Sequence, residues 1–200
     1  MSLLKSTITM EPVITAFEQL GINYYIGGSV ASSAYGIPRT TIDVDIIAEL
    51  RLEHVRPLVK LLEATYYVDA DMIRDAIRSR SEFNVIHLGT MLKVDVFIPK
   101  TRSFDQSMLH RIRREKIDPS ENDRLFYFAS PEDTILTKLE WYRMGGEVSE
   151  RQWNDLLGVL KLQGTSLDFD YLRRWAINLN VADLLDRAYE DAGLNEPDRV

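Results

Sequence analysis

The stretch GGSVASSAYGIPRTTIDVDII, residues 27–47, decides the fold of this protein. Its two glycines follow a short strand-like segment, and the small residues after them predict a helix that begins at Ser29. Its end, TIDVDII, is rich in β-branched residues and predicts a buried strand. Two aspartates, Asp43 and Asp45, interrupt this apolar strand. Acids are rare on buried strands, so this pair is a candidate functional feature.

Asp43 and Asp45 are neighbours if the segment is a strand, because alternate side chains of a strand share one face. At an effective dielectric of about 20, two such charges repel each other by roughly 4 kcal/mol. Solvent, a cation such as Arg39, a shared proton or a divalent metal ion would offset this repulsion. We expect Arg39 to bind a phosphate or a carboxylate by its charge.

A third acid, Asp95, lies in the segment KVDVFI, where it shares a face with Lys93 and Phe97. If this strand lies beside the first one, three carboxylates converge. An all-oxygen cluster suits Mg²⁺, and two ions about 4 Å apart would stabilise both oxygens of a phosphoryl transfer. The alternative is that Asp95 is a strand acid that pairs with Lys93.

The glycine turn Gly27–Gly28–Ser29 predicts a phosphate site directly before the acidic strand. Glycines let the backbone approach a phosphate closely, and a helix that begins at Ser29 would direct free N–H groups at it. A short glycine motif alone is more typical of an ordinary strand-to-helix turn. The acids that follow fourteen residues later favour the phosphate site.

Periodicity along the chain predicts an α/β (α+β) half, residues 1–130, followed by a helical half, residues 131–200, packed on it. Ser130 and Pro131, with Asp133 close behind, predict the start of a helix at this boundary. Strands are expected at 23–28, 41–50, 66–68, 82–89, 91–99 and 125–130, and helices at 10–21, 29–36, 54–64, 70–80, 103–117, 130–146, 149–164, 168–180 and 181–193.

Composition excludes several classes of protein. The chain has 200 residues, 45% of them apolar, which is enough for a substantial core, and it has no cysteine for disulfides or thiolate chemistry. Its net charge of −7 disfavours nonspecific binding to nucleic acid. No apolar run predicts a signal peptide or a membrane span, so the cytoplasm is the expected location.

The order of glycine, glycine, serine, a short helix, Asp-x-Asp on a strand and a later single Asp resembles the polymerase-beta-type nucleotidyltransferase superfamily. The segment SPEDTILTKLEWYRMGGEVSERQWNDLLGVL, residues 130–160, is similar to a helical motif of the abortive-infection and toxin-type members. The resemblance covers roughly residues 22–160. It implies a nucleotidyltransferase fold with a mixed sheet flanked by helices, followed by a C-terminal helical bundle.

The resemblance also implies roles for individual residues. Asp43, Asp45 and Asp95 would hold Mg²⁺, and Asp95 would help to deprotonate an acceptor hydroxyl. Gly28 and Ser29 would bind the β and γ phosphates of an NTP. In the helical motif, Lys138 would face the triphosphate and Asp155 would be the distal acid of the cleft. Without such roles, Lys138 would be a solvated surface residue and Asp155 an exposed helix acid near Arg151.

The expected function is transfer of a nucleoside monophosphate from an NTP to a hydroxyl of RNA, protein or a small molecule, with release of pyrophosphate. The acceptor, for which tRNA is one candidate, cannot be inferred from the family. Two alternatives stay open. One is a nucleotide- or partner-binding module without turnover, such as one component of a toxin–antitoxin pair. The other is a noncatalytic interaction protein whose acids only pair with arginines.

Overall fold

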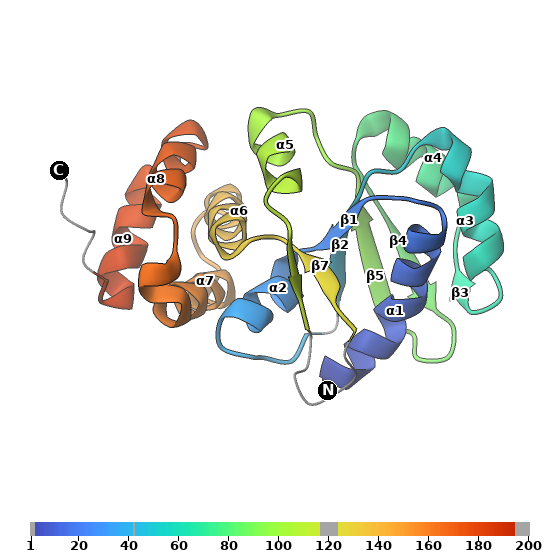
Figure 1. Cartoon of the computed structure of the whole chain (residues 1–200), viewed down its shortest axis with the longest axis horizontal. Helices are drawn as coiled ribbons and strands as arrows, with labels where there is room; N and C mark the ends of the chain where they lie inside the picture. The colour runs from blue at the N-terminus through green and yellow to red at the C-terminus, as the bar shows by residue number, and fades with distance from the viewer. Residues whose placement is uncertain (1–2, 42, 117–123, 195–200) are drawn as a thin grey trace. The chain divides into compact units, whose positions relative to one another are not determined.

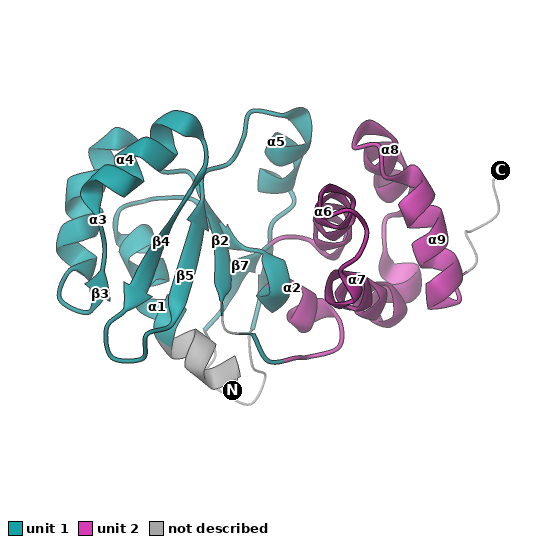
Figure 2. Cartoon of the chain, turned by 180° about the vertical axis from the view of Figure 1, so that it is seen from behind, with its two compact units in different colours: residues 1–30, 40–128 teal, residues 31–39, 129–200 magenta. Residues whose placement is uncertain are grey.

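The computed structural model describes residues 3–41, 43–116 and 124–194. The chain divides into two compact units (Figure 2). An α/β unit contains residues 1–30 and 40–128, and a helical unit contains residues 31–39 and 129–200. The segment 31–39 therefore belongs to the helical unit although it lies early in the sequence. No helix formed by the described residues is long and apolar enough to cross a membrane.

The α/β unit is built on a mixed sheet of seven strands in the order β3-β4-β5-β2-β1-β7-β6 (Figure 1). Strands β5 and β2 are parallel, as are β1 and β7, and the other neighbouring pairs are antiparallel. The strands are β1 (Tyr24–Ile26), β2 (Val44–Ala48), β3 (Tyr66–Tyr67), β4 (Glu82–His87), β5 (Lys93–Phe97), β6 (Arg113–Glu115) and β7 (Phe126–Phe128).

The two faces of the central strands differ in burial. Val44 and Ile46 of β2 and Val94 and Val96 of β5 are at most 1% exposed. Residues between them, including Asp45, face the other side and are only partly buried. This alternation is the period-2 pattern of a sheet that buries one face in a core.

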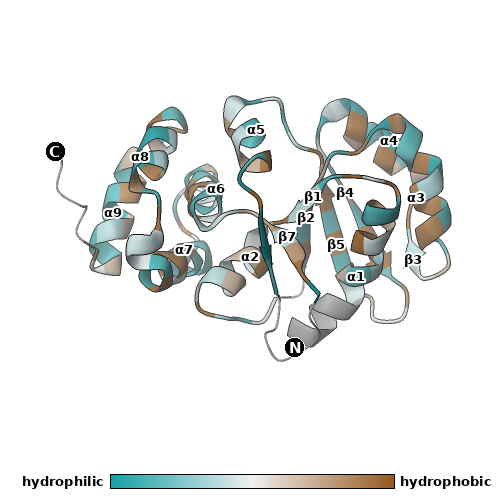
Figure 3. Cartoon of the chain, viewed as in Figure 1, coloured by the Kyte–Doolittle hydropathy of each residue, from teal (hydrophilic) through white to brown (hydrophobic). Residues whose placement is uncertain are grey.

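In the described part of the chain, five helices belong wholly or in part to the α/β unit, and some of them cover the sheet. Helices α1, α3 and α4 pack on one another and on β4 and β5. Hydrophobic and hydrophilic residues alternate along α3 and α4, as expected for helices with one buried face (Figure 3). The helices are α1 (Leu3–Gln19), α2 (Gly28–Tyr35), α3 (Val55–Leu62), which follows the short 3₁₀ helix Leu52–His54, α4 (Ala70–Ser79) and α5 (Ser103–Leu109).

The sequence prediction for the segment after β5 is wrong. The segment 103–117 was expected to be one helix, but α5 ends at Leu109 and β6 follows it. β6 pairs with β7 along Arg113, Arg114 and Glu115, so sheet hydrogen bonds override the helical spacing of this charged run. Residue 117 of the predicted helix and Ile42 of the predicted acidic strand lie outside the described residues.

The helical unit is organised around α6, whose side chains are buried on most sides. Ser130 caps this helix, its hydroxyl accepting the Asp133 N–H at 3.1 Å, and Pro131 occupies the first turn, as predicted. Helix α6 packs against α7 and α8, and α7 packs against α9. The helices are α6 (Pro131–Met144), α7 (Glu150–Gln163), α8 (Phe169–Asn178) and α9 (Ala182–Ala192), with the 3₁₀ helix Gly164–Ser166 between α7 and α8.

Candidate functional site

The glycine turn places the backbone directly against the carboxylate of Asp45. The Gly27 N–H donates to the Asp45 carbonyl at 2.9 Å, and α2 begins at the next residue. Gly28 has φ +55°, and a Cβ at this position would lie 1.7 Å from Asp45 Oδ2. Only glycine combines this left-handed conformation with so close an approach. Position 28 must therefore be glycine because the turn lies against the Asp45 side chain of β2.

Asp45 and Asp95 lie beside each other on the more exposed face of the sheet. They are register partners on the parallel strands β2 and β5, as the sequence predicted for adjacent strands. Asn84 of β4 is in turn the register partner of Asp95. A row of Asp45, Asp95 and Asn84 thus crosses three strands, and register partners of this kind have neighbouring side chains. Sequence reasoning did not identify Asn84, because only strand pairing brings it here.

Lys93 provides a positive charge next to this row. Its Nζ lies 2.9 Å from Asp95 Oδ2, so the pairing that the sequence left as an alternative is present. The hydrogen bond to Asp95 raises the pKa of Lys93, and the charges of Asp95, Asp43 and Glu82 add to this effect. Lys93 is therefore a charged ammonium group among carboxylates.

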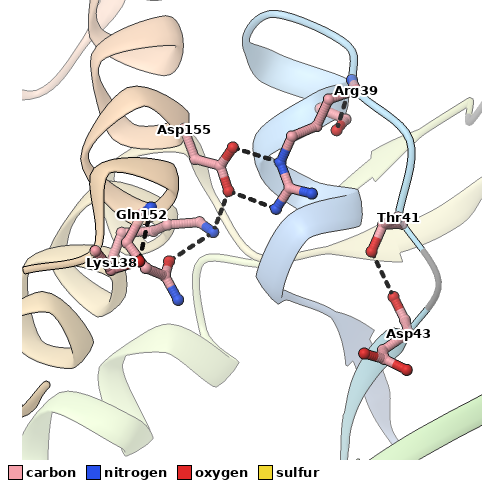
Figure 4. Close-up of polar contacts among 8 residues, drawn as sticks. Arg39, Thr41, Asp43, Lys138, Gln152 and Asp155 are labelled. Atoms are coloured by element: carbon pink, nitrogen blue, oxygen red, sulfur yellow. Dashed lines mark hydrogen bonds and ion pairs between the residues drawn. The ribbon is translucent and has the colours of Figure 1, made fainter.

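Asp43 lies immediately before β2 and is exposed. The Thr41 hydroxyl donates to the Asp43 carbonyl at 3.0 Å, which fixes the backbone at this point (Figure 4). Asp43 therefore does not occupy a paired strand position beside Asp45, as the sequence had suggested. Its charge still acts on Lys93, which places it in the same electrostatic neighbourhood.

The fit of a divalent metal to these acids is partial. Carboxylate oxygens are the donors that Mg²⁺ prefers, and Asp45 and Asp95 are adjacent by register. Among the described residues, however, no three Asp, Glu or His side chains are grouped so that they could hold one ion. The Mg²⁺ site at Asp43, Asp45 and Asp95 stays a prediction that the donor chemistry supports.

The helical unit contains a second cluster of charged residues, centred on Asp155 of α7 (Figure 4). Arg39 donates to both carboxylate oxygens, from Nε to Oδ1 at 2.6 Å and from a terminal nitrogen to Oδ2 at 2.8 Å. Lys138 of α6 donates to Asp155 Oδ2 at 2.7 Å and to Gln152 Oε1 at 2.9 Å. One carboxylate therefore holds two cations that lie about a hundred residues apart in the chain.

This second cluster is buried. The side chains of Lys138 and Asp155 are 5% and 6% exposed, and that of Arg39 is 25% exposed. Burial by itself raises the pKa of Asp155, but the hydrogen bonds from Arg39 and Lys138 outweigh it and lower that pKa. The hydrogen bond to Asp155 likewise raises the pKa of Arg39. Asp155 and Arg39 are therefore ionised at neutral pH.

The solvated surface positions considered for Lys138 and Asp155 are wrong, because both side chains lie inside the helical unit. The expectation that Arg39 binds a carboxylate is correct, and the partner is Asp155. Sequence reasoning missed Gln152, which lies one helical turn before Asp155 and orients Lys138. The signal in the sequence was the three-residue spacing of Gln152 and Asp155, which places both side chains on one face of α7.

Two glycines let the segment that carries Arg39 pack closely on α7. A Cβ at Gly36 would lie 2.8 Å from the Val159 nitrogen, and one at Gly158 would lie 3.1 Å from the Ile37 nitrogen. The Gln163 side chain also donates to the Tyr35 carbonyl at 2.8 Å. The segment is thus fixed on α7 by backbone packing as well as by the ion pair of Arg39.

No protein-family model matches the sequence, and no curated protein is similar to it. Solved structures are similar to its fold. The solution structure of the antibiotic-resistance factor ANT(2'')-Ia has a TM-score of 0.56 at 15% identity and covers 94% of this chain and 100% of its own. The crystal structure of ANT(2'')-Ia in complex with adenylyl-2''-tobramycin has a TM-score of 0.57 at 12% identity, covering 88% and 97%.

An antigenic nucleotidyltransferase-like protein from Paracoccidioides brasiliensis has a TM-score of 0.52 at 16% identity and covers 92% of this chain and 93% of its own. At these identities the likeness concerns the fold. The chain therefore has the α+β fold of nucleotidyltransferase-like proteins, as the resemblance of its motifs implied.

Proposed function

We propose that this protein is a Mg²⁺-dependent nucleotidyltransferase that moves a nucleoside monophosphate from an NTP to a hydroxyl acceptor. The observation that carries the proposal is the contact between Gly28 and Asp45, where a backbone turn that favours phosphates meets a carboxylate on the open face of the sheet. An ordinary strand-to-helix turn has no need of an acid at this position.

In this reaction the acceptor oxygen forms a bond to the α phosphorus, and the bond from that phosphorus to the β-phosphate oxygen breaks. Pyrophosphate leaves, and the proton of the acceptor hydroxyl passes to Asp95. In the turn Gly27–Gly28–Ser29, the N–H groups of Gly28 and Ser29 at the start of α2 would bind phosphate oxygens, since the Gly27 N–H is bonded to the Asp45 carbonyl. Asp43, Asp45 and Asp95 would hold Mg²⁺, which offsets the charge of the phosphates when bound.

Arg39, Lys138 and Asp155 enter the proposal differently. Lys138 was predicted to face the triphosphate and Asp155 to line the cleft, and both form a buried ion pair in the helical unit. We assign Asp155 the role of a positioning residue that holds Lys138 and Arg39. Phosphate binding by either cation stays a prediction.

The test is transfer of label from α-labelled NTPs with Mg²⁺ to a panel of acceptors that includes tRNA, protein and aminoglycosides. Transfer by the wild-type protein that Asp43→Asn and Asp45→Asn abolish supports the proposal. Transfer that both variants retain would remove these acids from the mechanism. Aminoglycosides belong in the panel because a similar structure contains an adenylylated tobramycin.

A second candidate is nucleotide binding without turnover, as in one component of a toxin–antitoxin pair. The observation that favours it is the ion pair of Lys93 with Asp95, which engages the acid that would accept the proton. In that case an NTP with Mg²⁺ would raise the melting temperature without forming a product. Product formation with any acceptor of the panel excludes this candidate.

A further inference from the structure

The row of Asp45, Asp95 and Asn84 on the more exposed face of the sheet has two different ends. At one end Asp45 lies against the turn at Gly28, where the phosphates of a nucleotide are proposed to bind. At the other end Asn84 of β4 is the register partner of Asp95 of β5. The proposed reaction uses the first end of the row and leaves Asn84 without a role.

Asn84 faces the same side of the sheet as Asp95. Its neighbours along β4, Phe83 and Val85, are at most 2% exposed and lie on the core side. Since side chains alternate along a strand, Asn84 lies on the opposite side, where it is only partly buried. The Cβ atoms of register partners in an antiparallel pair are roughly 4.5–5.5 Å apart. The Asn84 amide and the Asp95 carboxylate are therefore neighbours.

Both of these side chains have hydrogen-bonding capacity to spare. Lys93 Nζ lies 2.9 Å from Asp95 Oδ2, and no other described residue bonds to this carboxylate. A carboxylate can accept about four hydrogen bonds, so the ion pair leaves further lone pairs of Asp95 available. The Asn84 amide has no hydrogen-bond partner in the described part of the chain, and in particular it does not bond to Asp95.

A hydroxyl group is the ligand that complements this pair. A hydroxyl needs one acceptor for its proton, and its oxygen can accept hydrogen bonds through two lone pairs. The Asp95 carboxylate supplies the acceptor, and Asn84 Nδ2 supplies an N–H donor for one lone pair. The second lone pair of the hydroxyl oxygen stays free for attack on phosphorus.

We propose that Asn84 binds the acceptor substrate and holds its hydroxyl oxygen beside Asp95. The inference rests on the proposed function, because it names the residue that binds the second substrate of the same reaction. The hydroxyl oxygen bonds to the α phosphorus, its proton passes to Asp95, and pyrophosphate leaves. Neighbouring strands are about 4.8 Å apart, so the acceptor end at Asn84 lies about 10 Å from Asp45, two strands away.

Steady-state kinetics of the full-length protein test this assignment. Label transfer from α-labelled NTPs is measured at varied NTP and at varied concentrations of two hydroxyl probes, tobramycin and tRNA. Asn84→Leu, which keeps a similar volume without the amide, should lower kcat/KM for the probe that accepts label by about tenfold or more. The KM for NTP should change by less than about twofold. An unchanged kcat/KM for that probe would overturn the inference.

The arm that gives product shows whether the hydroxyl belongs to a small molecule or to RNA. Asn178→Leu removes an exposed amide at the end of α8 and is the matched control, which should leave both constants unchanged. Asn84→Gln retains the amide on a longer side chain and should recover part of the loss.

A purely structural role of Asn84 would give a different result. Loss of structure would impair the use of NTP and of the probe to the same extent, and equal losses for both substrates would overturn the inference. Asn84→Val takes the place of the leucine variant if that variant is unstable, because valine favours strands.

The outcome is separable from the test of the proposed function. Transfer by the wild type that Asn84→Leu retains in full would keep the enzyme and reject the role of Asn84. Absence of transfer from the wild type to every acceptor of the panel would reject the enzyme, and this inference with it.

Discussion

Asp45 of the α/β unit and Asp155 of the helical unit have opposite surroundings. The side chain of Asp155 is 6% exposed and accepts three hydrogen bonds from Arg39 and Lys138. Asp45 lies on the more exposed face of the sheet, beside a second acid and against the backbone of Gly28. Removing one partner of a buried ion pair destabilises a fold, whereas two adjacent carboxylates on an open face, with Lys93 on only Asp95 at 2.9 Å, suit a charged ligand.

Replacing Asp45 should give the largest change in activity and no loss of stability. We expect Asp45→Asn to lower the rate of nucleotidyl transfer by about a thousandfold or more, since it removes a charge that the reaction needs. The free energy of unfolding should stay nearly the same, because Asp45 lies on the more exposed face of the sheet. Label-transfer kinetics and urea denaturation measure the two quantities, and a marked loss of stability would show that Asp45 is structural.

Replacing Asp155, in contrast to replacing Asp45, should lower the stability of the fold. Asp155→Asn leaves Lys138 and Arg39 without their carboxylate and should lower the free energy of unfolding by about 3 kcal/mol. Glu190→Gln on α9 is the control, because Glu190 is exposed and its loss should change stability by less than about 0.5 kcal/mol. Equal effects of the two variants in urea denaturation would mean that the ion pairs of Asp155 contribute nothing.

The contact at Gly28 can be separated from its backbone conformation by a matched pair of variants. Gly21 has φ +65°, and a Cβ added there would have no atom within 4 Å. Gly28 has φ +55°, and a Cβ added there would collide with the Asp45 carboxylate. Gly21→Ala should cost about 1 kcal/mol from backbone strain alone. Gly28→Ala should cost more, and it should also weaken NTP binding about tenfold in isothermal titration. If the two variants are equally stable and bind NTP equally, the Asp45 side chain does not exclude a Cβ at position 28.

The pH dependence of stability should show the smallest effect. Because the pKa of Asp155 is lower in the folded protein, its ion pairs stabilise the fold above the ordinary carboxyl pKa, and this contribution is lost as pH falls through the lowered value. The difference in unfolding free energy between wild type and Asp155→Asn should therefore be largest near neutral pH and shrink in acid. A difference that does not vary from pH 7 to about pH 3 would contradict this origin.

The sequence predicted much of the fold. The central strands, the hairpin of β4 and β5, the capped start of α6 and the helices that follow all match local signals, because each has its own periodicity and turn residues. The segment 103–117 could not be predicted, since β6 exists only because β7 offers it a partner. Local spacing holds no information about a strand partner.

The sequence by itself predicted that Gly28, Asp45 and Asp95 lie together if their strands are neighbours, because a glycine turn and isolated acids on apolar strands are unusual wherever they occur. Only the tertiary structure decided which groups each acid meets. Strand register brought Asp45 and Asn84 to Asp95, and the packing of residues 36–39 on α7 brought Arg39 to Asp155. Such pairings join residues far apart in the chain, and their distances are set by the fold and not by spacing in the sequence.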